Sequence, residues 1–123
     1  METANSLKKV LLVEDDPFLQ SLLAQRLAAK GYKLFSAKEG TEALAIAERE
    51  MPEVILLDIL LPGMNGYEIL EKLKTNAKTK TINVIMVSNL GQQSDIDKAI
   101  ALGASKFFVK ANVTPEEIIS AVA

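Results

Sequence analysis

Charged and hydroxyl side chains follow four separate apolar runs in this sequence. Three consecutive acids occupy positions 14–16, and Asp58, Ser88 and Lys110 each come directly after another apolar run. Two like charges about 4 Å apart cost roughly 4 kcal/mol at an effective dielectric of 20, so adjacent acids near a core need a compensating partner. Carboxylate oxygens in a chain without histidine or cysteine are typical ligands of Mg²⁺, Mn²⁺ or Ca²⁺. The residue types therefore predict a divalent cation site built from oxygen ligands.

The same residues are suited to phosphate chemistry. Mg²⁺ usually takes one or two protein carboxylates and shares its remaining positions with water and phosphate oxygens. A lysine and a hydroxyl beside such a cation can hold further phosphate oxygens, and an aspartate can act as a nucleophile that forms an acyl phosphate. Because phosphoryl transfer depends mainly on positioning and charge neutralisation, these groups could carry it without a general base.

The composition argues against several other kinds of chemistry. The chain has no cysteine and no histidine, which removes disulfides, thiolate catalysis, imidazole bases and a histidine phosphodonor. Its 14 basic and 16 acidic residues give a net charge of −2, with no block of like charge that would favour nucleic acid or an anionic membrane. No apolar run approaches the roughly 18 residues of a membrane span, and the first residues lack the apolar segment of a signal peptide. We expect a cytoplasmic protein with no direct contact with nucleic acid or membrane.

Short apolar runs that read as strands alternate with helical patterns. Strands are predicted at residues 9–13, 32–37, 54–58, 82–87 and 106–109. Helices are predicted at residues 17–30 and 39–50, after Asn65, from Ser94 and Asp97 to Gly103, and after Thr114. Strict alternation predicts a parallel sheet with helices on both faces, and five strands are too few for a closed eight-stranded barrel. The sequence thus predicts one open, doubly wound α/β domain at residues 9–123, preceded by a tail at residues 1–8.

Two packing details follow from the same patterns. The first helix is expected to turn Phe18, Leu22, Leu23 and Leu27 toward the core. The run at residues 54–58 is apolar enough to form a strand that is covered on both faces.

In sheets of this kind the ligand site lies beyond the carboxyl ends of the strands, where the polar residues are expected. Each residue also has an ordinary explanation. Asp16 before Pro17 is a good helix cap, but one helix start needs one capping acid and leaves the other two acids unexplained. Asp58 alone could belong to a turn, Ser88 could be a loop hydroxyl, and Lys110 could be solvated. Only the coincidence of four strand ends favours a site.

Four motifs stand at these strand ends: Val13-Glu14-Asp15-Asp16, Leu57-Asp58-Ile59-Leu60-Leu61-Pro62-Gly63-Met64-Asn65-Gly66, Val87-Ser88 and Phe108-Val109-Lys110. They resemble the motifs of the receiver domain of two-component response regulators, and the match extends over residues 9–121. The second motif is the most specific of them. The resemblance implies a flavodoxin-like, doubly wound sheet of five parallel strands in the order 2-1-3-4-5 with five helices, and a site between strands one and three.

The resemblance also implies a role for each acid. Asp58 would be the phosphoacceptor and one of the residues that hold Mg²⁺, with Mn²⁺ as an alternative cation. Asp15 would be a direct cation ligand, Glu14 would act mainly through water, and the backbone carbonyl of Leu60 would complete the protein ligands. Asp16 falls outside this set, in agreement with a capping role.

The remaining roles concern the phosphoryl group and its effect on the surface. By the resemblance, Ser88 would bind a phosphoryl oxygen, Lys110 would form a salt bridge to the phosphoryl group, and Phe107 would be the switch aromatic that moves with Ser88. The phosphodonor would be a histidine kinase or a histidine phosphotransfer protein. The surface of the fourth helix, fifth strand and fifth helix would then control a downstream protein or an output domain. Such a domain is not a conventional enzyme, because it catalyses only its own phosphorylation and slow dephosphorylation.

Several positions depart from the family pattern. Ala111 follows the lysine where receivers usually have proline, so the customary cis peptide bond is not expected. Ser88 replaces the commoner threonine, and Asn89 stands where a small residue is usual. Leu60 is apolar at a position that influences hydrolysis of the phosphoryl group, and we predict slow autodephosphorylation because Leu60 cannot orient the attacking water.

Three alternatives compete with this interpretation. A receiver-like domain that serves only for docking would be favoured if the acids, the serine or the lysine were missing, and all are present. A phosphatase with an aspartate nucleophile would need a second acid at position 60, which is leucine. A flavin carrier of the same fold would need a phosphate-binding loop where residues 14–16 are acidic. The cognate kinase, the output and the oligomeric state are left open by the sequence, as is whether the domain stands alone.

Overall fold

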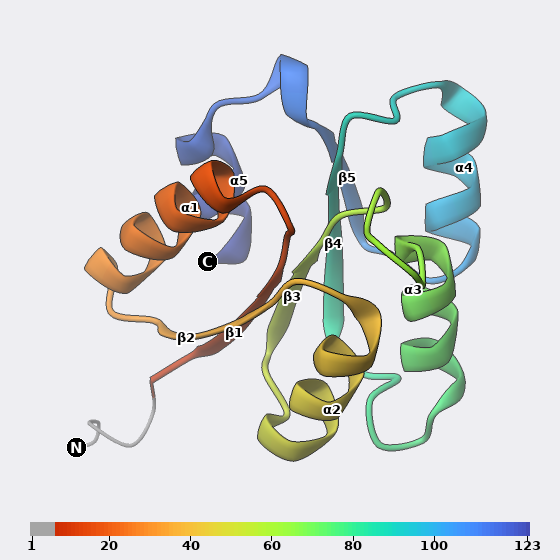
Figure 1. Ribbon diagram of the computed structural model, residues 1–123, viewed down its shortest axis with the longest axis horizontal. Helices are drawn as coiled ribbons and strands as arrows, with labels where there is room; N and C mark the ends of the chain where they lie inside the picture. Colours follow the sequence, from red (N-terminus) through yellow and green to blue (C-terminus); the bar gives the residue numbers. More distant parts are fainter. Residues whose placement is uncertain (1–6) are drawn as a thin grey trace.

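The computed structural model describes residues 7–123 and contains five strands and five α-helices in strict alternation (Figure 1). The strands are β1 (Lys9–Val13), β2 (Lys33–Ala37), β3 (Val54–Leu57), β4 (Asn83–Ser88) and β5 (Lys106–Val109). The helices are α1 (Pro17–Ala29), α2 (Gly40–Glu50), α3 (Gly66–Thr75), α4 (Gln93–Ala101) and α5 (Pro115–Val122), and a short 3-10 turn, η2 (Lys110–Asn112), follows β5. The predicted elements are therefore confirmed, most of them to within one residue at each end.

All strand pairs are parallel, and the sheet order is β2-β1-β3-β4-β5, which confirms the predicted doubly wound topology. In this order β3 lies in the centre between β1 and β4, whereas β5 forms an edge and pairs with β4 alone. Because all the strands are parallel, their carboxyl ends lie along one edge of the sheet, and β1, β3, β4 and β5 run toward the top of Figure 1.

Helices cover both faces of the sheet (Figure 1). Along each strand, alternate side chains join one of two hydrophobic clusters. On β3, Ile55 and Leu57 pack with α2 and α3, whereas Val54 and Leu56 pack with α1 and α5. All four residues of β3 are buried, which confirms the expected strand covered on both faces.

The helix starts follow from capping chemistry that the sequence displays. The side chain of Asp16 accepts a hydrogen bond from the backbone N–H of Phe18 at the start of α1. Asn65 and Glu68 form a capping box at α3, where each side chain accepts from the backbone N–H of the other residue. Thr114 begins α5 with a capping box of the same kind. These caps fix where three of the helices leave the loops around the carboxyl edge.

Two details of the sequence interpretation were wrong. The fourth helix begins at Gln93, because the carboxylate of Asp95 accepts a hydrogen bond from the backbone N–H of Gln92 at 3.1 Å, so Ser94 and Asp97 do not open it. Phe18 is 76% exposed instead of facing the core. At about 100° per residue Phe18 lies roughly opposite Leu27, which is buried, so the two cannot share one face of α1.

The expected tail at residues 1–8 lies outside the described residues except for its last two, and Leu7 is exposed. No helix within residues 7–123 is long and apolar enough to cross a membrane.

Candidate functional site

The register of the sheet brings the predicted residues to one edge. Val13 at the end of β1 pairs with Leu57 at the end of β3, so the next residues along these two strands, Glu14 and Asp58, lie side by side. On the other side of β3, Ser88 ends β4 opposite Val109, and Lys110 follows directly. The structure thus gathers the ends of four strands as the sequence predicts.

Three acids form the centre of this edge. Glu14, Asp15 and Asp58 each offer a carboxylate oxygen, and these oxygens all lie within 4.8 Å of one another. Glu14 is 2% exposed and Asp58 is 3% exposed, whereas the side chain of Asp15 faces solvent. Asp16 is absent from the cluster because its side chain caps α1. The distinction between one capping acid and two site acids therefore agrees with the geometry.

Lys110 joins the two buried acids. Its Nζ lies 2.8 Å from Oε1 of Glu14 and 2.8 Å from Oδ2 of Asp58. Burial of Lys110 lowers the pKa of its ammonium group, but the hydrogen bonds to Asp58 and Glu14 outweigh this effect, so the pKa of Lys110 is raised above its ordinary value. Charge-assisted hydrogen bonds of this length are among the stronger polar contacts in proteins.

The pKa of Glu14 is raised above its ordinary value. Burial raises the pKa of its carboxyl above the ordinary value, the contact with Lys110 opposes that rise, and the neighbouring charge of Asp58 adds to it. The backbone N–H of Asp16 donates to the second oxygen of Glu14 at 3.1 Å. A positive charge near Glu14 therefore stabilises its ionised form, and Lys110 supplies it in this structure.

The loop between β3 and α3 folds back closely against Asp58. The backbone N–H of Leu60 donates to Oδ1 of Asp58 at 3.2 Å, and that of Gly66 donates to the carbonyl oxygen of Ile59 at 2.9 Å. A Cβ atom on residue 66 would lie 2.3 Å from the backbone oxygen of Asp58, so any side chain at this position would force the loop to move. Gly66 is therefore required for this loop to hold Asp58 in place.

Ser88 and Phe107 lie on β4 and β5, the two strands on the other side of β3 from Glu14. Ser88 is fully buried, and its Oγ accepts a weak hydrogen bond from the backbone N–H of Leu90 at 3.4 Å. Phe107 is partly exposed and packs against the cluster formed by α2, α3 and the sheet. The serine hydroxyl and the aromatic ring thus occupy neighbouring strands, because Phe107 on β5 pairs with Met86 on β4.

The departures from the family pattern can also be located. Ala111 lies within η2, and residues 7–123 contain no cis peptide bond. The side chain of Asn89 is exposed, directly after the buried Ser88. Leu60 is 54% exposed and borders a cavity of about 480 Å³ beside Asp15. The rest of that cavity is lined by Ile59, Leu61, Pro62, Asn65, Tyr67 and Leu90.

Tyr67 is a residue of this region that sequence reasoning missed. Its hydroxyl donates to the backbone oxygen of Asp95 at 3.2 Å, and Nζ of Lys98 lies 4.3 Å from the centre of its ring. Burial raises the pKa of Tyr67, and the charge of Asp95 adds to this effect. The tyrosine therefore ties the start of α3 to the start of α4, next to the loop that follows Ser88. Its only sequence signal is that it is the one aromatic residue of an amphipathic helix.

The donor set fits a hard divalent cation. Three carboxylates within 4.8 Å, on a chain without histidine or cysteine, offer only the oxygen ligands that Mg²⁺ and Mn²⁺ accept. Buried carboxylates that face one another are stabilised by a cation. The residues that the sequence predicts are thus compatible with the cation that it predicts.

Comparison with known proteins gives a consistent picture. Residues 10–123 match the family described as "Response regulator receiver domain". The response regulator PleD of Caulobacter vibrioides is 36% identical over 102 residues, which are 83% of this chain and 22% of that protein. The phosphate regulon transcriptional regulatory protein PhoB of Rhizobium meliloti is 33% identical over 110 residues, which are 89% of this chain and 48% of that protein. The chain thus spans half or less of the length of these curated relatives.

Solved structures give the same picture for the fold. A putative response regulator from Chloroflexus aurantiacus superposes with a TM-score of 0.87 at 28% identity, with 95% of each chain covered. The chemotaxis protein CheY4 of Vibrio cholerae superposes with a TM-score of 0.88 at 26% identity, with 95% of this chain and 97% of that chain covered.

Proposed function

Because the chain belongs to the receiver domains of response regulators, we propose that it is the phosphoacceptor of a two-component signalling system and that Asp58 is the accepting residue. One observation carries this assignment to Asp58. The buried carboxylate of Asp58 lies within an acidic cluster suited to a cation, and it shares the ammonium group of Lys110 with Glu14. A cation and the ammonium group would together neutralise the oxygens of a phosphoryl group on Asp58.

The proposed reaction is a displacement at phosphorus. A carboxylate oxygen of Asp58 forms a bond to phosphorus as the P–N bond of a phosphohistidine breaks, and the electron pair of that bond stays on the imidazole nitrogen. The donor is a histidine kinase or a histidine phosphotransfer protein, and with acetyl phosphate the P–O bond breaks and acetate leaves. The product is an acyl phosphate on Asp58. Lys110 is close enough to Asp58 to hold an oxygen of the incoming phosphoryl group.

Mg²⁺ bound at the acids would neutralise the charge of the phosphoryl oxygens and help to place them in line with the attacking carboxylate. Asp15 and Asp58 would hold the cation directly, together with the backbone carbonyl of Leu60, and Glu14 would act mainly through water. The exposure of Asp15 supports this assignment, since its carboxylate can reach a solvated ion.

Phosphorylation would change the surface through Ser88 and Lys110. The new group carries a charge of about −1.5 to −2 and three acceptor oxygens, which attract a hydroxyl and an ammonium group. Ser88 would move toward it with the loop that begins α4, and Phe107 would fill the space behind the serine. Because Phe107 lies on β5, the change would reach the surface of α4, β5 and α5.

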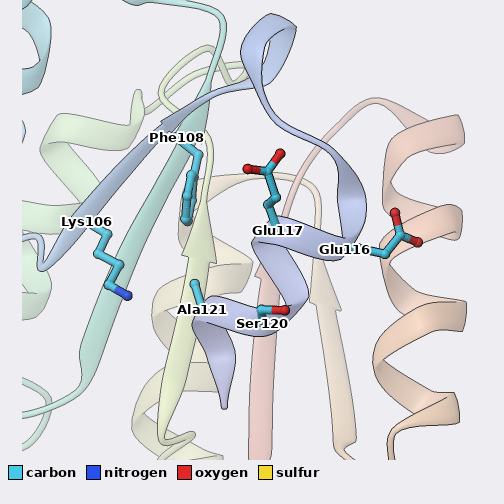
Figure 2. A pocket seen from close by; sticks show the side chains of 6 residues that line it. All are labelled: Lys106, Phe108, Glu116, Glu117, Ser120 and Ala121. Carbon is cyan, nitrogen blue, oxygen red and sulfur yellow. The ribbon is translucent and has the colours of Figure 1, made fainter.

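This proposed output surface contains a pocket of about 450 Å³ between β5 and α5 (Figure 2). Its lining residues are Lys106, Phe108, Glu116, Glu117, Ser120 and Ala121. We propose that a downstream protein or an output domain docks on this side in the cytoplasm. Among the curated relatives, PhoB is by name a transcriptional regulatory protein, which supports an output on gene expression.

The test is phosphorylation by acetyl phosphate, followed by intact mass spectrometry, with and without Mg²⁺. The wild type is expected to gain one phosphoryl group only when Mg²⁺ is present, and Asp58→Asn is expected to gain none. Beryllofluoride, which mimics the phosphoryl group, should bind the wild type under the same conditions. A wild type that stays unmodified in both experiments would favour a domain that serves only for docking.

A further inference from the structure

Tyr67 connects two helices that begin at the carboxyl edge of the sheet, and it takes no part in the proposed reaction. Its hydroxyl, at the start of α3, donates to the backbone oxygen of Asp95 in the first turn of α4 at 3.2 Å, and Oδ1 of the same residue lies at 3.4 Å. Nζ of Lys98, also on α4, lies 4.3 Å from the centre of the tyrosine ring. Both contacts cross from α3 to α4, so they hold the starts of the two helices together.

The α3 side of this contact is fixed to the acceptor strand. Gly66, the residue before Tyr67, lies so close to Asp58 that a Cβ atom on it would be 2.3 Å from the backbone oxygen of Asp58. The backbone N–H of Gly66 also donates to the carbonyl oxygen of Ile59 at 2.9 Å. Because one peptide bond joins Tyr67 to Gly66, the position of the tyrosine is set by the backbone around the acceptor.

The α4 side is joined to Ser88 by a short loop. Only residues 89–92 separate the end of β4 at Ser88 from the start of α4. At the far end of this loop, the carboxylate of Asp95 accepts a hydrogen bond from the backbone N–H of Gln92 at 3.1 Å. A connection of four residues that is held at the helix leaves Ser88 little freedom to move unless the start of α4 moves with it.

A cavity lies between this loop and the acidic cluster. It has a volume of about 480 Å³ and is bordered by Asp15 of the cluster, by Leu90 of the loop and by Tyr67 itself. A phosphoryl group on Asp58 would attract Ser88 and draw the loop toward this space. The oxygen–oxygen distance of 3.2 Å already exceeds the usual range of about 2.5–3.0 Å for a hydroxyl donor, so a small shift of α4 breaks the contact.

We propose that Tyr67 is a positioning residue that holds the start of α4 in its unphosphorylated place, so that its contact with α4 opposes the change that phosphorylation of Asp58 drives. The tyrosine acts through the loop and Ser88 and does not touch the phosphoryl group. Loss of its hydroxyl destabilises the unphosphorylated arrangement alone and shifts the equilibrium toward the other one. This inference rests on the movement of Ser88 in the proposed function, and it names a residue that sets how easily that movement occurs.

The experiment is a titration of the Mg²⁺-loaded protein with beryllofluoride, followed through amide NMR signals. A hydrogen bond between neutral groups changes an equilibrium constant by about two- to tenfold, and Tyr67→Phe, which removes only the hydroxyl, should bind beryllofluoride more tightly than the wild type by about that factor. Tyr32→Phe makes the same change at the other tyrosine of the chain, which packs against the cluster on the opposite face of the sheet, and should leave the affinity unchanged. A general loss of packing does not tighten binding, so the direction of the effect is diagnostic.

A second variant tests the contact from the side of α4. Lys98→Met removes the ammonium group over the ring, and a cation–π contact at an exposed site changes an equilibrium constant by about two- to fivefold. Beryllofluoride binding should therefore tighten by at least about twofold. Lys72→Met removes another exposed lysine, on α3, and is the matched control that should not tighten binding. Because Lys98 is exposed, its variant keeps the test available where Tyr67→Phe folds poorly.

The NMR spectrum without beryllofluoride gives a signature that a merely structural role would not produce. In Mg²⁺-loaded Tyr67→Phe, the amide signals of residues 93–96, in the first turn of α4, should move from their wild-type positions toward those of the wild type bound to beryllofluoride. A loss of packing alone would displace these signals in unrelated directions, and that result would contradict the inference.

The outcomes separate this inference from the proposed function. Equal or weaker binding of beryllofluoride by Tyr67→Phe and Lys98→Met than by the wild type would overturn the role of Tyr67 and leave the acceptor site intact. Equally tight binding by Tyr32→Phe and Tyr67→Phe would also contradict it, since the effect would not depend on the contact with α4. Binding by Tyr67→Phe without binding by the wild type would support it in its strongest form. Absence of binding in every variant would overturn both the role of Tyr67 and the proposed function.

Discussion

Leu60 determines what a phosphoryl group on Asp58 would meet on its solvent side. The side chain is 54% exposed, lies two residues after the proposed acceptor, and borders the cavity beside Asp15. Hydrolysis of an acyl phosphate needs a water molecule aligned with phosphorus. An isobutyl side chain offers no hydrogen bond that could orient such a water, so the identity of this residue bears directly on the lifetime of the signal.

We predict slow autodephosphorylation of the wild type and a faster reaction in Leu60→Asn. An amide at this position can hydrogen-bond the attacking water, and we expect hydrolysis to become about tenfold faster. The measurement is the loss of the phosphorylated mass with time after removal of acetyl phosphate. Ile100→Asn, which places the same amide at another exposed apolar residue, on α4, is the matched control and should not change the rate. A half-life of seconds with Leu60 intact would contradict the prediction.

The raised pKa of Glu14 predicts a pH dependence of stability. A carboxyl whose pKa is higher in the folded state binds more protons when folded, so its contribution to the unfolding free energy falls as pH rises from the ordinary value of 4.5 through the raised one. In metal-free buffer, the unfolding free energy of the wild type relative to Glu14→Gln should fall by at most about 1.4 kcal/mol per pH unit across that interval and then level off.

Urea unfolding at a series of pH values measures this difference. Glu71→Gln, at an exposed acid on α3, is the matched control for loss of a carboxylate. A difference between the wild type and Glu14→Gln that grows with pH would reverse the sign of the prediction.

The limits of sequence reasoning are visible in these side chains. Asp58, Ser88 and Lys110 could be placed at one edge because each follows a strand and parallel strands end together. The contact of Lys110 with both acids could not be predicted, since it depends on the conformation of a flexible side chain. The three residues follow three different strands, β1, β3 and β5. The hydroxyl contact of Tyr67 with Asp95 was equally out of reach, because it joins two helices that share no sequence signal.

At the scale of the elements, the loop from β3 to α3 is the most tightly constrained connection of the site. Its capping box and the close approach of Gly66 hold the chain against Asp58. The strands and most caps could be predicted because they depend on local chemistry. The buried face of α1 could not be predicted, because Phe18 and Leu27 lie on opposite faces and only the position of the sheet decides which of them is buried.

Gly66→Ala should disturb both the fold and the site. The added Cβ would lie 2.6 Å from Cα of Ile59 as well as against the carbonyl of Asp58, so the loop must move, at a cost of about 2–3 kcal/mol. Gly63→Ala is the matched control, because its φ of 72° strains an alanine by about 1–2 kcal/mol while no heavy atom lies within 4 Å.

Urea unfolding gives the two stabilities, and acetyl phosphate labelling gives the function. At equal fractions of folded protein, Gly66→Ala should be phosphorylated more slowly than Gly63→Ala. Equal rates would mean that the approach of the loop does not position Asp58.

At the scale of the whole molecule, two acids of the site, Glu14 and Asp58, are buried at the carboxyl edge of the sheet. A ligand that binds the folded state alone raises its stability, so a cation at this edge should stabilise the entire domain. At about 100 times its dissociation constant, Mg²⁺ should add about 2.7 kcal/mol to the unfolding free energy.

Removal of the cation tests this effect. Thermal melts of the wild type should shift downward by several degrees when EDTA replaces saturating Mg²⁺. Asp15→Asn should lose the shift, because it removes the exposed acid of the cluster, whereas Glu117→Gln on α5 should keep it. A shift that persists in Asp15→Asn would place the stabilising ion elsewhere.

The sheet order has a mechanical consequence. Asp58 extends from β3, which is hydrogen-bonded on both sides, whereas Lys110 extends from β5, which has one neighbour. Displacing β5 strains one ladder of hydrogen bonds and displacing β3 strains two, so the acceptor stands on a stiff support and the lysine on a compliant one. A force between these two charges would therefore move the lysine and its strand, and β5 carries that displacement to the outer edge of the molecule.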